Sequence, residues 1–365
     1  MLSSEKFIST LKKRINFFTG VPDSTLKSIT HPLQKLSKKK HIIATNEGSA
    51  VSLAIGYYLT KKKIAAVYLQ NSGLGNAINP LVSIANSNVY SIPMLLVIGW
   101  RGSPNSNDEP QHIEQGKITL NLLKLLKIKT LIIKRDSDLK KITKIINFSK
   151  SKKIPVACLI ERNGLKSKRK ITIENNKNFL LRSYTISNIL DKIKKNTKII
   201  STTGYTSREL YQIRKQYKYK KGKDFYMVGG MGHSSMVSLG VALNSNKEVL
   251  CLDGDGSLLM HLGGMGIAGN FGTKNFKHVL FNNGSHESVG GQPTIANKIN
   301  FKKLSLSLGY KRYFKSDNKL NFSKELNKFL KSNGPSFFEI KIRNEKIKNL
   351  ARPKELKTVK RIFIK

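Results

Sequence analysis

Acidic residues are scarce in this chain, and their scarcity makes it strongly basic. Asp and Glu number 22 against 66 Lys and Arg, which gives a formal net charge of +44 over 365 residues. Such a charge makes nucleic acid a candidate partner. The lysines are spread over the whole length, however, with no interleaved aromatic patch and no DNA-binding motif. We therefore expect no nucleic-acid partner, and a basic nucleic-acid-binding protein remains the alternative from a different functional class.

Cysteines and long apolar runs are also rare, which argues against a disulfide-rich protein and against a membrane protein. Cys158 and Cys251 both lie in apolar runs, so we interpret them as small buried side chains rather than as disulfide partners or metal ligands. No apolar run reaches the roughly 18 residues that cross a bilayer. The first residues, MLSSEKFISTLKKRINFF, contain no signal-peptide core. We expect no membrane association and a cytoplasmic location.

Apolar runs rich in β-forming residues alternate with helix-length segments along the chain. The runs are His41–Thr45, Ile64–Leu69, Met94–Gly99, Thr130–Ile133 and Pro155–Ile160 in the first half, and Lys198–Thr202, Phe225–Val228, Val249–Leu252, His278–Phe281 and Phe337–Ile342 in the second. This alternation predicts parallel sheets covered by helices on both faces. We predict an α/β protein with two doubly wound parallel-sheet domains, at residues 1–165 and 183–365, and a basic, polar linker at 166–182.

The most informative motif is Gly254-Asp255-Gly256, followed after 25 residues by Asn282-Asn283. Each half follows an apolar run, and in a parallel βαβ unit both strands end at the same edge of the sheet. The Asp255 carboxylate and the Asn283 amide oxygen suit Mg²⁺, which prefers hard oxygen ligands. Glycines and a helix starting near Ser257 let backbone N–H groups approach a phosphate. The motif therefore predicts a site for Mg²⁺ and a phosphorylated ligand.

This spacing resembles the thiamine-diphosphate signature of the 2-oxo acid decarboxylase superfamily. The resemblance implies thiamine diphosphate as cofactor and Mg²⁺ held by Asp255, Asn283 and the backbone carbonyl of Ser285. It implies a pyrimidine-binding first domain and a diphosphate-binding second domain, without the middle domain that many members insert. It also implies a homodimer or larger homo-oligomer with sites at the subunit interface.

The same resemblance assigns further cofactor contacts and an activating acid. The cofactor contacts are Gly204, Tyr205, Met231, His233, Gly254, Gly256 and Ser257, together with Asp255 and Asn283. Glu47 opens an apolar helix expected over Glu47–Leu59, in the context NEGSA. A glutamate at a helix N-terminus is also favourable for structural reasons alone. The resemblance implies that Glu47 hydrogen-bonds the aminopyrimidine ring and thereby activates the cofactor.

Two N-terminal motifs indicate a narrower group within this superfamily. The GVPDS turn at 20–24 and the sequence GWRG, DEPQH and QG between 99 and 116 resemble those of phosphonopyruvate decarboxylases and, second, of sulfopyruvate decarboxylases. We expect Arg101 to Gln115 to form one long loop after a strand, where open α/β sheets build their sites. Besides Glu47, the expected catalytic residues are Asp23 and His112, and the expected substrate contacts are Ser24, Asn71, Arg101, Gln111, His286 and Glu287.

The predicted reaction is the thiamine-diphosphate- and Mg²⁺-dependent decarboxylation of 3-phosphonopyruvate, a small anionic 2-oxo acid, to 2-phosphonoacetaldehyde and CO₂ in phosphonate biosynthesis. A sulfopyruvate decarboxylase is the close alternative, because it differs mainly in the anionic head group. The broader alternative is another thiamine-diphosphate-dependent 2-oxo acid decarboxylase or a carboligase.

Overall fold

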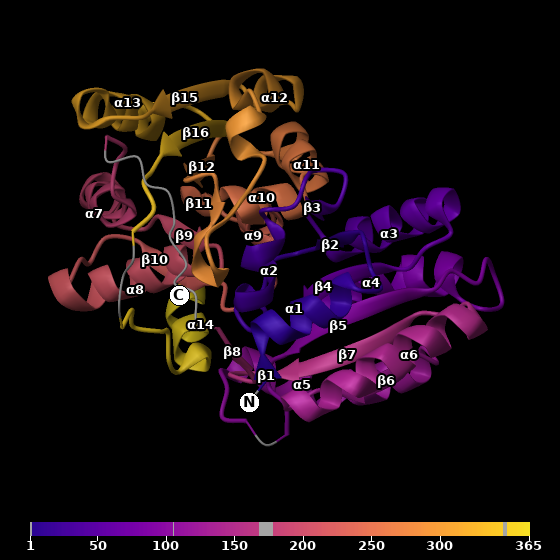
Figure 1. Cartoon of the computed structure of the whole chain (residues 1–365). Helices are drawn as coiled ribbons and strands as arrows, with labels where there is room; N and C mark the ends of the chain where they lie inside the picture. The colour runs from indigo at the N-terminus through magenta and orange to yellow at the C-terminus, as the bar shows by residue number, and fades with distance from the viewer. Residues whose placement is uncertain (1, 105, 168–177, 346–348) are drawn as a thin grey trace. The chain divides into compact units, whose positions relative to one another are not determined.

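The computed structural model describes residues 2–104, 106–167, 178–345 and 349–365. The chain forms two compact α/β units, Met1–Thr172 and Ile173–Lys365 (Figure 1). Each unit is built on one six-stranded parallel sheet. This agrees with the predicted fold class, and no middle domain separates the units in the described part of the chain.

The first unit has the sheet order β3-β2-β4-β5-β7-β6. Its strands are β1 (Leu2–Ser3), β2 (Phe18–Gly20), β3 (His41–Ile43), β4 (Ala65–Gln70), β5 (Met94–Trp100), β6 (Lys129–Ile132), β7 (Val156–Glu161) and β8 (Leu165–Lys166), of which β1 and β8 pair separately. Its helices are α1 (Ser4–Lys12), α2 (Lys27–Leu33), α3 (Glu47–Lys61), α4 (Leu74–Pro80), α5 (Pro110–Leu125) and α6 (Leu139–Lys152), with short turns η1 (Asn71–Gly73), η2 (Leu81–Ala85) and η3 (Asp136–Asp138).

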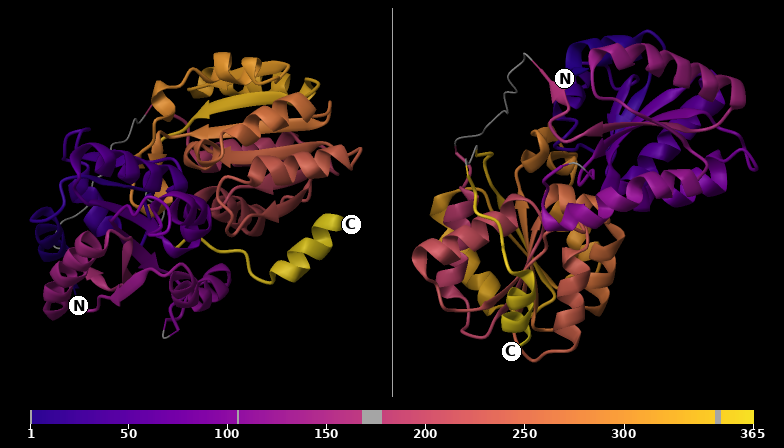
Figure 2. Two further views of the ribbon diagram at one scale, coloured as in Figure 1. Left: turned by 90° about the vertical axis from the view of Figure 1, so that its right-hand side faces the viewer. Right: turned by 90° about the horizontal axis from the view of Figure 1, so that it is seen from below.

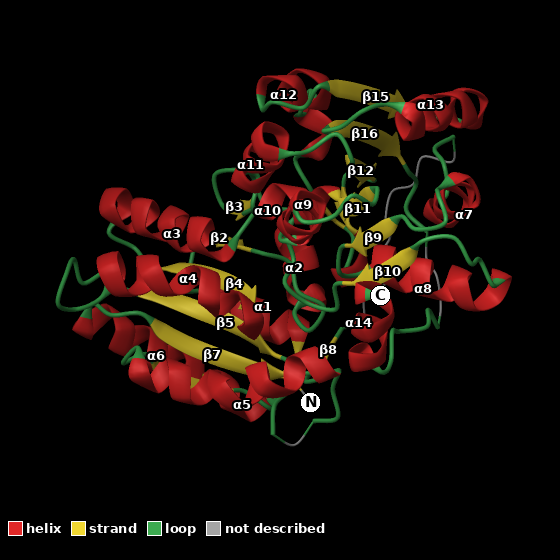
Figure 3. Ribbon diagram, turned by 180° about the vertical axis from the view of Figure 1, so that it is seen from behind, coloured by secondary structure: helices red, strands yellow, loops and turns green. Residues whose placement is uncertain are grey.

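Helices cover both faces of the first sheet (Figures 1 and 3). Side chains of α3, α4 and α5 form the core on one face, and those of α1, α2 and α6 form the core on the other. The central strand β5, with the sequence MLLVIGW, is buried along its whole length. A strand buried on both faces has no solvent side, which is why it appears in the sequence as a continuous apolar run.

The second unit has the sheet order β10-β9-β11-β12-β16-β15. Its strands are β9 (Lys198–Ser201), β10 (Lys223–Tyr226), β11 (Val249–Gly254), β12 (Phe276–Asn282), β13 (Ser285–His286), β14 (Gln292–Pro293), β15 (Arg312–Ser316) and β16 (Ser336–Lys341). Its helices are α7 (Arg182–Lys192), α8 (Tyr205–Tyr217), α9 (Ser234–Leu243), α10 (Asp255–Met260), α11 (Gly263–Phe271), α12 (Phe301–Ser307), α13 (Lys319–Lys331) and α14 (Leu356–Ile364), with short turns η4 (Glu287–Val289) and η5 (Ala296–Lys298). Helices α7, α8 and α13 pack on one face and α9 to α12 on the other (Figure 2).

Each apolar run that the sequence analysis assigned to a strand forms one, with shifts at the ends. The edge strand β15 was missed because its sequence, RYFKS, is polar and largely outside the core. The expected long loop from Arg101 to Gln115 was wrong, since α5 begins at Pro110 and the loop ends at Glu109. Proline is favourable at the first position of a helix because it lacks the N–H that would remain unpaired there.

The expected linker, 166–182, falls at the division between the two units. Its residues 168–177 lie outside the described residues, while β8 ends at Lys166 and α7 begins at Arg182. Both cysteines are buried, as expected. In the described part of the chain, no helix is both long and apolar enough to cross a membrane.

Candidate functional site

The Gly-Asp-Gly turn and the paired asparagines lie at the same edge of the second sheet. Strands β11 and β12 are parallel neighbours, and their register places Gly254 opposite Phe281. Asp255 follows β11 directly as the first residue of α10, and Asn283 follows β12. The prediction that both strands deliver these residues to one edge is therefore confirmed.

The Asp255 carboxylate is buried, and its burial outweighs the groups that stabilise its charge. The residue is 2% exposed, and its Oδ2 accepts a hydrogen bond from Thr294 Oγ1 at 2.5 Å. Burial raises the pKa of Asp255 to about 6, and the Thr294 hydrogen bond only partly opposes this rise. Ser285 is also buried, and its hydroxyl has no hydrogen-bond partner among the described residues. A carboxylate, an amide oxygen and a backbone carbonyl form an oxygen donor set that fits Mg²⁺.

Asn283 is held through both ends of its amide. Its Nδ2 donates to Glu287 Oε2 at 3.1 Å, and its Oδ1 accepts from the backbone N–H of Ser285 at 3.1 Å. Glu287, expected to contact the substrate, is 8% exposed and also accepts from Arg182 and from the backbone N–H of Glu345. The Glu287 carboxylate is thus engaged by three groups of the protein, one of them the Asn283 amide, and its expected contact with the substrate stays a prediction.

The Ser257 hydroxyl joins three of the segments expected to bind the cofactor. It lies 2.8 Å from Thr202 Oγ1, after β9, and accepts from the backbone N–H of Gly232 at 3.1 Å. Gly256 permits a second close approach, because a Cβ there would lie 2.8 Å from His286 Nδ1 and 3.5 Å from Met231 Cε. Burial lowers the pKa of His286 to about 4, so this imidazole is neutral near pH 7.

Gly204, Tyr205 and His233 flank the same edge of the second sheet. Gly204 directly precedes α8, whose N-terminus offers backbone N–H groups to an anion. The Tyr205 ring carries the Arg208 guanidinium 4.9 Å from its centroid, which places a positive charge beside this helix start. His233 stacks on His261 with ring centroids 4.5 Å apart. These groups are basic or polar, as a diphosphate site requires.

In the first unit, Glu47 is a buried acid at the start of α3. Asn46 caps the helix by accepting from the backbone N–H of Ser49 at 2.8 Å, and Glu47 itself is 5% exposed. Burial raises the pKa of Glu47, and the hydrogen bond from Asn76 Nδ2 to Glu47 Oε2, 2.7 Å long, opposes this rise. Gly73 is required beside it, since a Cβ there would lie 2.2 Å from Glu47 Oε1.

Asp23 is a second buried acid of the first unit. Its Oδ2 accepts from the backbone N–H groups of Thr25 at 2.9 Å and Leu26 at 3.2 Å, so it caps the turn before α2. Its Oδ1 is buried and has no hydrogen-bond partner among the described residues. Burial raises the pKa of Asp23 to about 6, while the charge of Arg101 opposes the rise. An acid with a pKa near neutrality suits proton transfer.

Arg101 forms a tight ion pair within its own loop. Its Nε and Nη2 donate to the two oxygens of Asp108 at 2.6 and 2.5 Å, and its Nη1 donates to Ser24 Oγ at 3.0 Å. Arg162 Nη1 also reaches Asp108, at 3.0 Å. Burial alone would raise the pKa of Asp108. The hydrogen bond from Arg101 and those from two backbone N–H groups outweigh this effect, so the pKa lies below its usual value. The pair holds Arg101 and Asp108 of this loop together.

The Asn71 side chain supports this loop. Its Nδ2 donates to the backbone carbonyl of Arg101 and to Thr119 Oγ1, each at 2.9 Å, and its Oδ1 accepts from the Arg101 backbone N–H at 3.1 Å. Asn71 is 1% exposed, and its expected contact with the substrate stays a prediction. Gln111 and His112 are half-buried in the first turn of α5.

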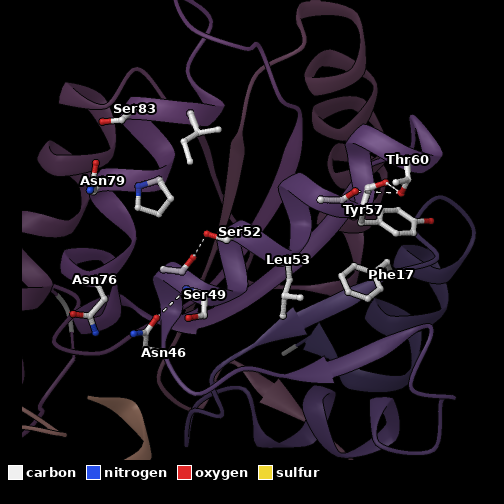
Figure 4. Close-up of a pocket in the computed structure, with 14 residues that line it drawn as sticks. Phe17, Asn46, Ser49, Ser52, Leu53, Tyr57, Thr60, Asn76, Asn79 and Ser83 are labelled. Carbon is white, nitrogen blue, oxygen red and sulfur yellow. Dashed lines mark hydrogen bonds between the residues drawn. The ribbon is translucent and has the colours of Figure 1, made fainter. Parts of the chain in front are cut away.

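A large groove of the first unit begins beside Glu47 (Figure 4). It runs between α3 and the segment formed by α4 and η2, with a volume of about 1030 Å³. None of its lining residues is charged; they are Phe17, Asn46, Gly48, Ser49, Ser52, Leu53, Gly56, Tyr57, Thr60, Asn76, Asn79, Pro80, Ser83 and Ile84. Such a surface is unusual in a chain in which 24% of the residues are charged.

Sequence reasoning missed several residues that hold the candidate ligands in place. Thr294 reaches Asp255 from 39 positions away, and Arg182 reaches Glu287 across 105. Arg182 also lies in the segment expected to be a linker. Asn76 contacts Glu47, and this contact depends on how α3 packs against α4. None of these pairings has a spacing that marks it in the sequence.

Known proteins match both units. Residues 1–122 match the family model described as thiamine pyrophosphate enzyme, N-terminal TPP binding domain, and residues 202–340 match the corresponding C-terminal TPP binding domain. The chain is 30% identical over 352 residues to the phosphonopyruvate decarboxylase of Streptomyces viridochromogenes, which covers 92% of this chain and 87% of that enzyme. It is 29% identical over 352 residues to the phosphonopyruvate decarboxylase of Streptomyces hygroscopicus, covering 92% and 86%.

A partial match points to the related enzyme with a sulfonate substrate. The chain is 35% identical over 147 residues to the sulfopyruvate decarboxylase subunit beta of Methanothermobacter thermautotrophicus, which covers 40% of this chain and 73% of that subunit. Both thiamine pyrophosphate domains are thus present, and similarity to decarboxylases of this type extends over most of the sequence. The chain therefore belongs to the thiamine pyrophosphate enzymes, as a thiamine-diphosphate-dependent decarboxylase, a carboxy-lyase, of the family that includes the phosphonopyruvate decarboxylases.

Proposed function

We propose that this chain decarboxylates 3-phosphonopyruvate to 2-phosphonoacetaldehyde and CO₂, using thiamine diphosphate and Mg²⁺, as a step of phosphonate biosynthesis. The observation that carries this proposal is the similarity to phosphonopyruvate decarboxylases across both units. Decarboxylation of sulfopyruvate is the second candidate, because a sulfopyruvate decarboxylase subunit also matches. The two substrates differ in whether the anionic head group is a phosphonate or a sulfonate.

In this proposal the second unit holds the metal and the diphosphate. Asp255, the Oδ1 of Asn283 and the backbone carbonyl of Ser285 bind Mg²⁺, while the start of α8 and the residues around Ser257 receive the diphosphate. When bound, thiamine diphosphate supplies the electron sink for the loss of CO₂. The buried position of Asp255 supports this assignment, because a divalent cation compensates a negative charge that the ligand-free protein leaves costly.

The buried acids of the first unit, Glu47 and Asp23, have roles in proton transfer. Glu47 is hydrogen-bonded by Asn76 and has a pKa raised by burial, so it can hold a proton at a fixed position for the pyrimidine ring. Asp23, whose pKa of about 6 lies near neutrality, and His112 are the candidates for protonating the product. The proposed substrate contacts are Ser24, Asn71, Arg101, Gln111 and His286. The positive charge of the chain favours encounter with an anionic 2-oxo acid.

We further propose that the enzyme is a homodimer or a larger homo-oligomer with sites at the subunit interface, located in the cytoplasm. The uncharged groove beside Glu47 supports self-association. Two copies that each carry a formal charge of +44 repel each other, which favours contact through surfaces without lysine and arginine. The groove is such a surface, and a nucleic acid or an acidic peptide would find no charge partner on its walls.

The substrate assignment is tested by steady-state kinetics with phosphonopyruvate, sulfopyruvate and pyruvate. Phosphonopyruvate should exceed pyruvate in kcat/KM by about 10³ or more, because pyruvate leaves the polar groups for the head group unpaired. A clear preference for sulfopyruvate would select the second candidate. Equal turnover of pyruvate would contradict both head-group assignments while leaving a decarboxylase of the same family.

A further inference from the structure

A buried ionic cluster adjoins the turn that carries Asn283. We call Arg182, Glu209 and Glu287 the Arg182 cluster; its side chains are 7%, 2% and 5% exposed. Arg182 Nη1 donates to Glu209 Oε1 at 2.5 Å, and Nη2 donates to Glu287 Oε2. The three residues come from the start of α7, from α8 and from η4. None of them has a part in the proposed reaction.

Glu287 connects this cluster to the candidate metal ligand. The oxygen that accepts from Arg182 also accepts from Asn283 Nδ2 at 3.1 Å, and the other oxygen accepts from the backbone N–H of Glu345 at 2.5 Å. The carboxylate therefore receives three N–H donors. Only a side chain that accepts at both of its oxygens satisfies all three, because a glutamine would present a donor to one of them.

The contact decides which end of the Asn283 amide is available to a cation. An amide has an oxygen that binds metal ions and an NH₂ group that repels them, and the two ends have nearly the same shape. With Nδ2 held by Glu287, the oxygen is the remaining end of the side chain. If the amide rotated by half a turn, its oxygen would face the carboxylate of Glu287 and its NH₂ would point to the backbone N–H of Ser285. Both contacts would then be repulsive.

The energetic cost of the cluster also requires a reason. Removing one guanidinium and two carboxylates from water is expensive, and apolar residues of similar volume often stabilise a fold equally well. A role in orienting the neighbouring metal ligand would explain why the cluster is kept, because groups that hydrogen-bond metal ligands tune metal affinity. Arg182 compensates the buried negative charges of Glu209 and Glu287, so the acceptor that Asn283 needs can remain in the interior.

We propose that Glu287, held by Arg182, is a positioning residue that fixes the Asn283 amide with its oxygen available to the metal. This inference rests on the proposed Mg²⁺ centre and gives Glu287 a role other than the expected substrate contact. Arg182, which lies at the end of the expected linker, thereby becomes part of the support of the metal site.

The test measures Mg²⁺ affinity by calorimetry in the full-length protein with saturating thiamine diphosphate. Glu287→Ala should weaken Mg²⁺ binding about 10- to 100-fold, the range expected for loss of a group that orients a metal ligand. Glu209→Ala is the matched control, since it removes the other buried acid from Arg182 without touching Asn283. Its affinity should stay within about threefold of the wild type. Equal losses in both variants would overturn the proposal, because they would indicate general damage to the cluster.

A second comparison isolates the orientation of the amide. In the Asn283→Asp background, Glu287→Ala should not weaken Mg²⁺ binding, because a carboxylate has two equivalent oxygens and no wrong orientation, and its contact with the Glu287 carboxylate is repulsive. A tenfold loss in that background would overturn the proposal. If Glu287→Ala does not fold, Glu287→Met fills the space without accepting a hydrogen bond and takes its place. If the wild type binds no Mg²⁺, the proposed metal centre fails, whereas normal wild-type binding with an unaffected Glu287 variant refutes only this inference.

Discussion

Replacing Asp255 by Asn should stabilise the ligand-free protein and abolish its Mg²⁺ binding. The carboxylate is buried, and burial raises its pKa from 3.8 to about 6. At 1.36 kcal/mol per pKa unit, this rise corresponds to about 3 kcal/mol by which the folded state disfavours the ionised form. Asparagine has nearly the same shape and can still accept the hydrogen bond from Thr294, but it carries no charge.

The pH dependence of this effect has a defined sign. Because the folded-state pKa is raised, the neutral carboxyl contributes its full stability below pH 3.8, and this contribution is lost as the pH rises to about 6. The variant has no such group. The difference in unfolding free energy between Asp255→Asn and the wild type should therefore grow from about zero at low pH to about 3 kcal/mol in favour of the variant above pH 6.

Urea unfolding of both proteins across this pH range, without metal and cofactor, measures the difference. Asp317→Asn serves as the control, because the Asp317 side chain is 41% exposed and its replacement should give no comparable pH-dependent gain. At about pH 8, Mg²⁺ with thiamine diphosphate should stabilise only the wild type, by about 2.7 kcal/mol at 100 times the dissociation constant. A variant that is no more stable than the wild type at this pH would refute the burial argument. A variant that still binds Mg²⁺ would refute the ligand assignment.

Two further predictions concern Glu47 and the subunit interface. Glu47→Gln should leave thiamine diphosphate binding nearly unchanged in calorimetry and lower kcat at least about 10²-fold, the scale of acid–base roles; near-normal turnover would remove Glu47 from the mechanism. Glu47→Gln and Asp255→Asn, each inactive alone, should regain activity when mixed under subunit exchange, because one wild-type site forms in each mixed dimer. Exchange that is proven by mass spectrometry but restores no activity would favour a site made within one chain.

The sequence predicts the fold well because most strands are buried on both faces. A strand such as β5 must be apolar throughout, and this makes it visible without any tertiary information. Edge strand β15 has one side near solvent and a polar sequence, so no apolar run marks it. The start of α5 was misplaced although Pro110 and the helical stretch after it carry the signal, because the charged residues before it were interpreted as part of a binding loop.

The candidate site likewise has residues whose positions the sequence predicts and residues whose positions it does not. The positions of Asp255 and Asn283 follow from the chain direction of two neighbouring strands, so they are predictable from spacing alone. The groups that hold them are not: Thr294, Arg182 and Glu287 meet their partners through packing that no local pattern encodes. Arg101 illustrates the same limit, because its sequence position suggests a free cation for an anionic substrate, whereas Asp108 pairs with it in the fold.

Glu47 and Asp255 share one physical property although they lie in different units. Each is buried, and burial raises the pKa of each carboxyl, so each makes its own unit less stable near neutral pH when it is ionised. A carboxyl group that lowers stability in this way is typical of a position kept for function. Mg²⁺ would relieve the cost at Asp255, and a ring nitrogen that shares a proton with the carboxyl would relieve it at Glu47. Thiamine diphosphate and Mg²⁺ should therefore raise the stability of both units together, whereas a diphosphate without a pyrimidine ring should stabilise only the second.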